Sequence, residues 1–128
     1  MTPETRRHLD KANDDLAKAR QVFDLLHYSD EAARLAYLAA FHAAQALISE
    51  RTGRSAKTHA GVHSQFNPMV RGDPRVDGEL RSFLSNAFDL KTVADYEVGA
   101  KAFVSPEEAE AAIATAMRFV ACVATLLA

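Results

Sequence analysis

The segment from Ala36 to Leu47 is apolar on nearly every side of a helix, and it constrains the fold more than any other part of the chain. A helix with so little polar surface is stable in water only when protein surrounds it on most sides. The segment therefore predicts a central helix with several neighbours. Three polar side chains lie within it, Tyr37, His42 and Gln45, and each requires an explanation.

Two long helices are predicted before Gly53. Apolar residues recur at steps of three and four between residues 9 and 26, the pattern of an amphipathic helix of about 22 residues that begins near Pro3. Ser29 or Asp30 can cap a second helix, which contains the apolar segment and ends near Arg51. Gly53 is the expected stop signal.

Three further helices are predicted after Gly53. A short one covers about residues 58–70, and Pro68 is expected to fray or kink it because proline lacks the amide hydrogen of the helical ladder. The next is expected to begin with Asp73 as its N-cap and to end near Tyr96. The last begins with a capping-box sequence at Ser105.

No segment shows the alternation that is typical of strands, so the predicted fold class is all-α. We expect an antiparallel four-helix-type bundle with an additional short helix, about five helices in total, in one domain over residues 1–128. The first, second and last helices carry more apolar surface than one small bundle readily hides. A symmetric homodimer is the expected consequence.

Composition gives a weaker indication of function. The formal net charge of −2 argues against a general nucleic-acid coat protein. The chain shows neither a signal-peptide layout nor an apolar run of the roughly 18 residues that a membrane span needs, so we expect a cytoplasmic protein. The single Cys122 lies in an apolar helical run, where a thiol behaves as a small hydrophobic group.

One region departs from this mildly acidic background. Residues 51–72 contain no Asp or Glu but four cationic side chains, Arg51, Arg54, Lys57 and Arg71. Their charge either complements the negative end of the second helix or forms a patch for phosphate or nucleic-acid backbone.

The same region carries His59 and His63, four residues apart. That spacing could place two imidazoles on one metal ion, but a zinc site needs further ligands, and the sequence offers only His42 and Asp95. We therefore expect no metal and no cofactor. Arg54 and His59 form an Arg-x4-His pair, in which the arginine could steady a phosphoryl oxygen while the histidine moves a proton.

A second group of candidates ends the fourth predicted helix. Lys91 and Asp95 have the spacing of an ordinary helical ion pair. Alternatively, the lysine, the carboxylate and the phenol of Tyr96 could form a polar pocket together with His42.

In three places the chain resembles the HEPN domain family (higher eukaryotes and prokaryotes nucleotide-binding), particularly its small stand-alone prokaryotic members. The residues that carry the resemblance are the Ala36–Leu47 helix, the Lys57–Val62 turn with Phe66 after it, and Ala94–Tyr96. The resemblance implies an antiparallel helical bundle that is usually dimeric. It also implies a nucleotidyltransferase partner, since such proteins are frequently encoded together as toxin and antitoxin.

Active HEPN ribonucleases carry an Arg-x4-6-His motif, and two copies form a metal-independent RNA-cleaving site across the dimer. Here Lys91 stands in the place of the arginine, and no histidine follows it. Lysine lacks the planar fork with which arginine grips a phosphate. The resemblance therefore favours a catalytically degenerate protein that binds a nucleotide, RNA or a nucleotidyltransferase partner.

The candidate residues follow from these arguments. The binding candidates are Tyr37, His42, Arg51, Lys57, His63, Lys91, Asp95 and Tyr96. If the protein is instead an active metal-independent ribonuclease, His59 and Arg54 are the catalytic candidates. A purely structural helical dimerisation module is the third alternative.

Overall fold

The computed structural model describes residues 1–96 and 103–128; the side chain of Tyr96 lies outside the described part. The described residues form five helices and no strand: α1 (Pro3–Leu26), α2 (Ser29–Thr52), α3 (His59–Val70), α4 (Gly78–Tyr96) and α5 (Pro106–Leu127). Four helices are long and α3 is short. The predicted all-α class and helix number are confirmed.

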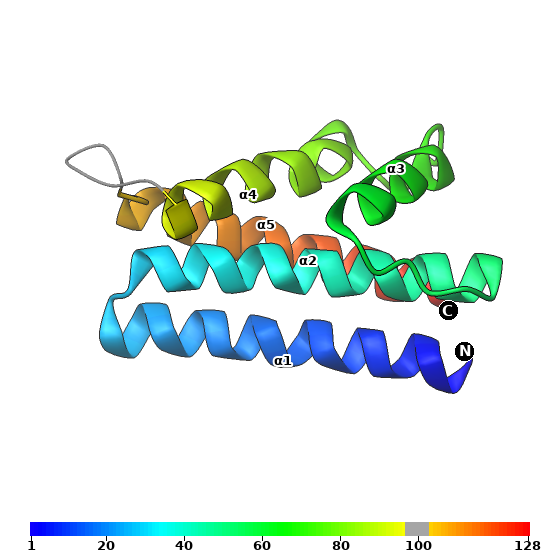
Figure 1. The fold of residues 1–128 in the computed structure, drawn as a ribbon, viewed down its shortest axis with the longest axis horizontal. Helices are drawn as coiled ribbons and strands as arrows, with labels where there is room; N and C mark the ends of the chain where they lie inside the picture. Colours follow the sequence, from blue (N-terminus) through cyan, green and yellow to red (C-terminus); the bar gives the residue numbers. More distant parts are fainter. Residues whose placement is uncertain (97–102) are drawn as a thin grey trace.

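Helix α2 forms the centre of the bundle. It lies antiparallel to α1, packs against α4 and α5, and carries α3 over its C-terminal half (Figure 1). Most of its residues between Ala32 and Ser49 are buried. Its many alanines allow the neighbouring helices to approach closely, because interhelical distance depends on the side chains at the contact.

Several helix boundaries follow the predicted signals. Thr2 caps α1 by accepting a hydrogen bond from the Thr5 amide, and Gly53 ends α2 in the left-handed region at φ 71°. The capping box between Ser105 and Glu108 begins α5 with both of its reciprocal hydrogen bonds. Local sequence chemistry is sufficient to set these ends.

Two predicted details of α2 and α3 differ. Neither Ser29 nor Asp30 caps α2; the carboxylate of Asp30 instead accepts a hydrogen bond from the Val104 amide, at 3.0 Å. Helix α3 continues through Pro68 to Val70. The proline lies in the last turn, where the packing of buried Phe66 and Val70 holds the helix.

Helix α4 begins later than predicted. Asp73 is not its N-cap: its carboxylate binds Arg75, and the helix begins at Gly78. Asp77 satisfies the first turn by accepting a hydrogen bond from the Leu80 amide, at 2.9 Å. Both aspartates suit a helix start, and the extra turn at residues 73–76 decides between them.

Helix α5 has the length and apolar composition to cross a membrane, although no apolar run of that length was predicted from the sequence. Helix α5 packs mainly against α2, and its buried Phe119 contacts Phe66 of α3 and Phe83 of α4. Cys122 is partly buried on this helix, and its Sγ donates to the Arg75 carbonyl at 3.4 Å.

Candidate functional site

A buried tyrosine hydroxyl joins two histidines where α2, α3 and α4 meet. Tyr37 is fully buried, and its Oη lies 2.7 Å from His59 Nδ1 and 3.0 Å from His63 Nε2. The ring of Phe88, from α4, packs against all three side chains. We call these four residues the tyrosine–histidine cluster.

The start of α3 positions the two histidines. Thr58 caps the helix by accepting a hydrogen bond from the Gly61 amide, at 3.0 Å. A Cβ at residue 61 would lie only 2.8 Å from Thr58 Oγ1, so glycine is the residue that this cap permits. The first turn then places His59 and His63 on the side that faces Tyr37.

The cluster is uncharged at neutral pH. Burial lowers the pKa of His59, and the Lys91 ammonium lowers it further. Burial, followed by the charge of His59, lowers the pKa of His63, and burial raises the pKa of Tyr37. The neutral phenol has one hydrogen to donate, so it donates to one imidazole and accepts an N–H from the other.

This arrangement can relay a proton. When Tyr37 donates to His59 Nδ1, the outer nitrogen of His59, Nε2, carries a hydrogen. If that hydrogen leaves to water, both shared protons shift toward His59 and a proton enters at His63 Nδ1, then His59 Nε2 presents a lone pair and each ring stays neutral. The outer edge of His59 is exposed to solvent. The cluster therefore offers either a donor or an acceptor at the surface without a net charge.

Lys91 lies beside the cluster and forms the predicted ion pair with Asp95. Its Nζ is 6.0 Å from the centroid of the Phe88 ring. The carboxylate offsets the positive charge of the ammonium. Among the described residues, no three His, Cys, Asp or Glu side chains gather as metal ligands would.

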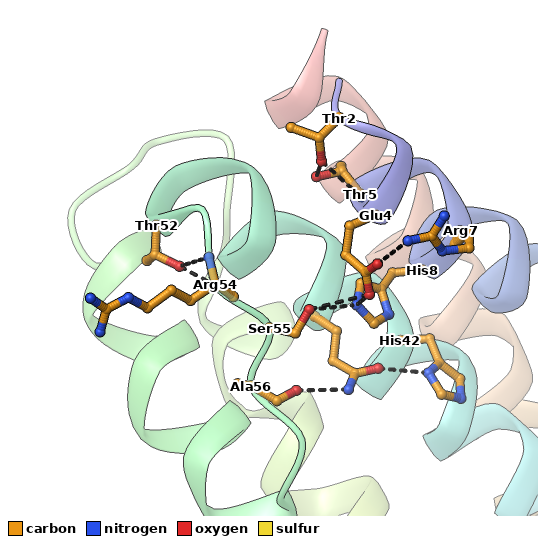
Figure 2. Close-up of polar contacts among 11 residues, drawn as sticks. Thr2, Glu4, Thr5, Arg7, His8, His42, Thr52, Arg54, Ser55 and Ala56 are labelled. Atoms are coloured by element: carbon orange, nitrogen blue, oxygen red, sulfur yellow. Dashed lines mark hydrogen bonds and ion pairs between the residues drawn. The ribbon is translucent and has the colours of Figure 1, made fainter.

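Other predicted residues lie apart from the cluster. The Arg54 amide donates to Thr52 Oγ1, and its side chain points away from Glu4, His8 and His42, as Figure 2 shows. The described contacts thus do not join Arg54 to His59. Arg51 donates to the Met69 carbonyl at 3.1 Å and ties the ends of α2 and α3 together. Lys57 is exposed.

His42 belongs to a different set of contacts (Figure 2). Its Nδ1 lies 2.8 Å from Gln45 Oε1. Its Nε2 lies 3.6 Å from Asp15 Oδ2. Gln45 donates through Nε2 to the Ala56 carbonyl at 2.8 Å. Because the amide nitrogen of Gln45 donates, its oxygen accepts, and His42 Nδ1 carries the hydrogen. His42 therefore does not complete the predicted pocket with Lys91 and Asp95.

A third group of polar contacts, at the start of α1, was not predicted from the sequence. His8 Nε2 lies 3.3 Å from Glu4 Oε1 and 3.5 Å from Ser55 Oγ, and Ser55 donates to the same carboxylate oxygen at 3.2 Å (Figure 2). In a catalytic triad the serine and the carboxylate contact opposite nitrogens of the imidazole. Here both approach Nε2, so the geometry is that of a structural tie.

Asp15 also escaped prediction. It is 2% exposed and lies 3.5 Å from Lys11 Nζ, and its Oδ2 has no hydrogen-bond partner among the described residues. The available signal was its position in the apolar stripe of α1, between Ala12 and Ala19. We refer to the contacts of α1 with α2 and the following turn as the α1 network, made by Glu4, His8, Asp15, His42, Gln45 and Ser55.

Comparison with known proteins identifies a family and a structural neighbour. The model of the HEPN domain matches residues 5–126, nearly the whole chain. A crystal structure of TT1696 from Thermus thermophilus has a TM-score of 0.78 with 22% identity, covering 97% of this chain and 98% of that one. At that identity the likeness shows a shared fold.

Two relatives are similar in sequence. The UPF0332 protein glr0978 of Gloeobacter violaceus is 31% identical over 119 residues, which cover 93% of this chain and 92% of the relative. A protein of Methanocaldococcus jannaschii named "Putative toxin MJ0605" is 31% identical over 109 residues, covering 85% and 78% of the two chains.

Proposed function

The chain belongs to the HEPN domain family, and from that premise we propose that it binds RNA without cleaving it, as a member of a toxin–antitoxin type of system. The name of the archaeal relative supports the toxin–antitoxin part of the proposal. The binding surface is the side of α3 and α4 that carries the tyrosine–histidine cluster.

One observation carries the proposal. The fourth helix has Lys91 paired with Asp95 where active family members have an arginine followed by a histidine. An ionised aspartate donates no proton, and an ammonium held by it cannot clamp a phosphate as a guanidinium does. Binding requires neither of these, because backbone charge and base stacking suffice for single-stranded RNA.

The cluster supplies features that suit such binding. The exposed imidazole of His59 lies 4.9 Å from the Phe41 ring and 5.2 Å from the Phe88 ring, centroid to centroid. Single-stranded RNA is bound by stacking of its bases on aromatic side chains next to cationic ones. Lys57, exposed at the start of α3, is a cation near this surface.

Purified protein incubated with a labelled single-stranded RNA in EDTA tests the proposal. We expect a mobility shift or a rise in anisotropy that weakens with salt, and intact RNA afterwards. His59→Asn preserves an acceptor near the Nδ1 position and provides the control for any cleavage. Absence of binding, measured on folded protein, would remove this function.

An active metal-independent ribonuclease is the second candidate, and the Tyr37 hydroxyl between two histidines favours it. A relay of this kind provides a general acid and a general base at the surface. Cleavage in EDTA that His59→Asn abolishes and that Arg54→Gln leaves intact would establish this alternative. Loss of cleavage in both variants would instead restore the Arg-x4-His pair.

The proposal includes a cytoplasmic homodimer and a nucleotidyltransferase partner. Large apolar side chains at one end of the bundle are consistent with an interface: Leu25 is 75% exposed, Tyr28 60% and Phe103 71%. Light scattering gives the mass of the assembly, and monomeric protein at micromolar concentration would exclude the homodimer.

A further inference from the structure

A second polar surface lies at the other end of the contact between α3 and α4. His63, early in α3, packs against Phe88 of α4, whereas Asn67 and Arg71, at the end of α3, approach the first turn of α4. The two helices thus run past each other with the tyrosine–histidine cluster at one end. At the other end they line an open pocket.

The pocket has a volume of about 360 Å³. It is lined by Asn67, Arg71, Gly78, Arg81 and Ser82. Arg81 is held in place, because its Nη1 donates to the Val76 carbonyl at 2.8 Å. A Cβ at residue 78 would lie 3.5 Å from Arg81 Nη2, so the guanidinium packs closely over Gly78.

The carboxylates around this pocket are engaged elsewhere. Asp73 binds Arg75 through both carboxylate oxygens, and Arg75 lowers the pKa of Asp73 to about 2. Asp77 and Glu79 both pair with Arg118. Within the described part of the chain, Arg71 and Arg81 have no carboxylate partner. Two arginines therefore face one pocket with their charge uncompensated.

The position of the pocket in the fold also suits an anionic ligand. The pocket adjoins the first turn of α4, whose dipole favours negative charge, although Asp77 already accepts the hydrogen bond of the Leu80 amide. Asn67 lines the pocket, and its buried Oδ1 has no hydrogen-bond partner among the described residues.

We propose that Arg71 and Arg81 form a phosphate site that seats a phosphodiester of single-stranded RNA, while bases of the same strand reach the tyrosine–histidine cluster. This inference rests on the proposed RNA-binding function and adds a location to it. Arginine forks match the two non-bridging oxygens of a phosphodiester.

The spacing of the two ends selects an oligonucleotide. His63 and Arg71 are eight residues apart, about 12 Å along a helix at 1.5 Å per residue. A stacked strand rises about 3.4 Å per nucleotide, so about four nucleotides are needed to span both ends. A mononucleotide reaches one end at a time.

Anisotropy titrations with labelled oligouridylates of two, four and eight nucleotides test the site in the full chain. We expect a marked gain in affinity between the two- and four-nucleotide ligands. Arg71→Gln should weaken binding of the longer ligands roughly tenfold, the equivalent of one charged hydrogen bond. It should also reduce the salt dependence by about 0.7 in the log–log slope.

Controls separate this loss from a change of charge or fold. Arg6→Gln removes the same charge from an exposed position on α1 and should leave affinity within about twofold. Arg81→Lys keeps the charge but loses the fork, and thermal melting reports whether its loss of the Val76 contact affects folding. Arg81→Lys should weaken binding in protein that melts normally.

The outcomes distinguish the two proposals. If the wild type binds RNA and Arg71→Gln behaves as Arg6→Gln does, the phosphate site is overturned and the RNA-binding function stands. If the wild type binds no RNA, the function fails and the inference that rests on it fails too. Inorganic pyrophosphate that shifts the Gly78 and Ser82 amide resonances, in wild type but not in Arg71→Gln, would then retain a phosphate site alone.

Discussion

The tyrosine–histidine cluster and the α1 network both place histidines beside α2, but their partners differ in charge. His59 and His63 meet a neutral phenol. His8 and His42 instead approach the carboxylates of Glu4 and Asp15. The first arrangement leaves exchangeable protons next to an exposed imidazole edge, whereas the second ties one helix to another.

The comparison shows that residue type alone does not identify a functional histidine. His8, Ser55 and Glu4 have the composition of a hydrolytic triad, yet they converge on a single ring nitrogen. His59 and His63 lack a carboxylate partner, yet they share one hydroxyl through which a proton can pass. Whether a histidine belongs to a structural tie or to a functional site therefore depends on which of its ring atoms are contacted, not on which residue types lie nearby.

The largest expected effect lies in the α1 network. Gln45→Met keeps the volume of a side chain that is 6% exposed but removes its hydrogen bonds to His42 and to the Ala56 carbonyl. The buried Ala56 carbonyl and the partly buried His42 Nδ1 are left without this partner, so we expect a loss of about 2–4 kcal/mol in the free energy of unfolding. Urea denaturation measures it. RNA affinity of the folded fraction should not change.

Tyr37→Phe makes the matching change in the tyrosine–histidine cluster. The ring stays in the core, but His59 and His63 lose their shared partner. Because water can reach His59, we expect a smaller destabilisation of about 1–2 kcal/mol. A larger loss than that of Gln45→Met would show that the cluster contributes more to stability than the α1 network does.

Most of the fold was predictable because local sequence patterns, the spacing of apolar residues and the capping residues, determine the helices. The apolar Ala36–Leu47 segment required a central helix, and Gly53 and Ser105 set helix ends through the backbone geometry that they favour. The start of α4 was missed because Asp73 and Asp77 carry the same capping signal. Only the tertiary partner of each aspartate separates them.

The candidate site was predictable only in part. Tyr37, His59 and His63 were singled out, since polar groups in an apolar helix and an acid-free turn stand out in sequence. Their shared hydroxyl depends on how α3 crosses α2, which no spacing encodes. His42 was predicted to lie beside Lys91 and Asp95, which was wrong for the same reason. Arg81 was not predicted, because its charge is uncompensated only when the nearby acids Asp77 and Glu79 pair with Arg118.

The pH dependence of the free energy of unfolding should also separate the two regions, with a smaller effect than the two substitutions above. The pKa of His59 and of His63 is lowered in the folded state. When the pH falls below the pKa of about 6.5 that a histidine has in the unfolded chain, the unfolded state therefore binds more protons than the folded state. Their contribution is complete above about pH 6.5 and is lost as the pH falls below it.

The double variant His59→Asn and His63→Gln should flatten this loss between about pH 7.5 and 5.5. Some slope should remain, because burial also lowers the pKa of His8, against the attraction of Glu4. Urea midpoints across this range give the measurement. Equal slopes in the variant and the wild type would contradict the neutral state assigned to the cluster.

Ser55→Ala should have the smallest effect, and it tests whether the α1 network is only a tie. The hydroxyl donates one partly buried hydrogen bond to Glu4, so we expect a loss of about 0.5–1 kcal/mol. Ser64→Ala, which removes an exposed bond to the Gly61 carbonyl, is the matched control.

Because both Ser55 and the Glu4 carboxylate contact His8 Nε2, no base is aligned to activate Ser55, and a fluorophosphonate probe should not label the wild type. Labelling that disappears in Ser55→Ala but persists in Ser64→Ala would show that the α1 network is a reactive centre and not only a structural tie.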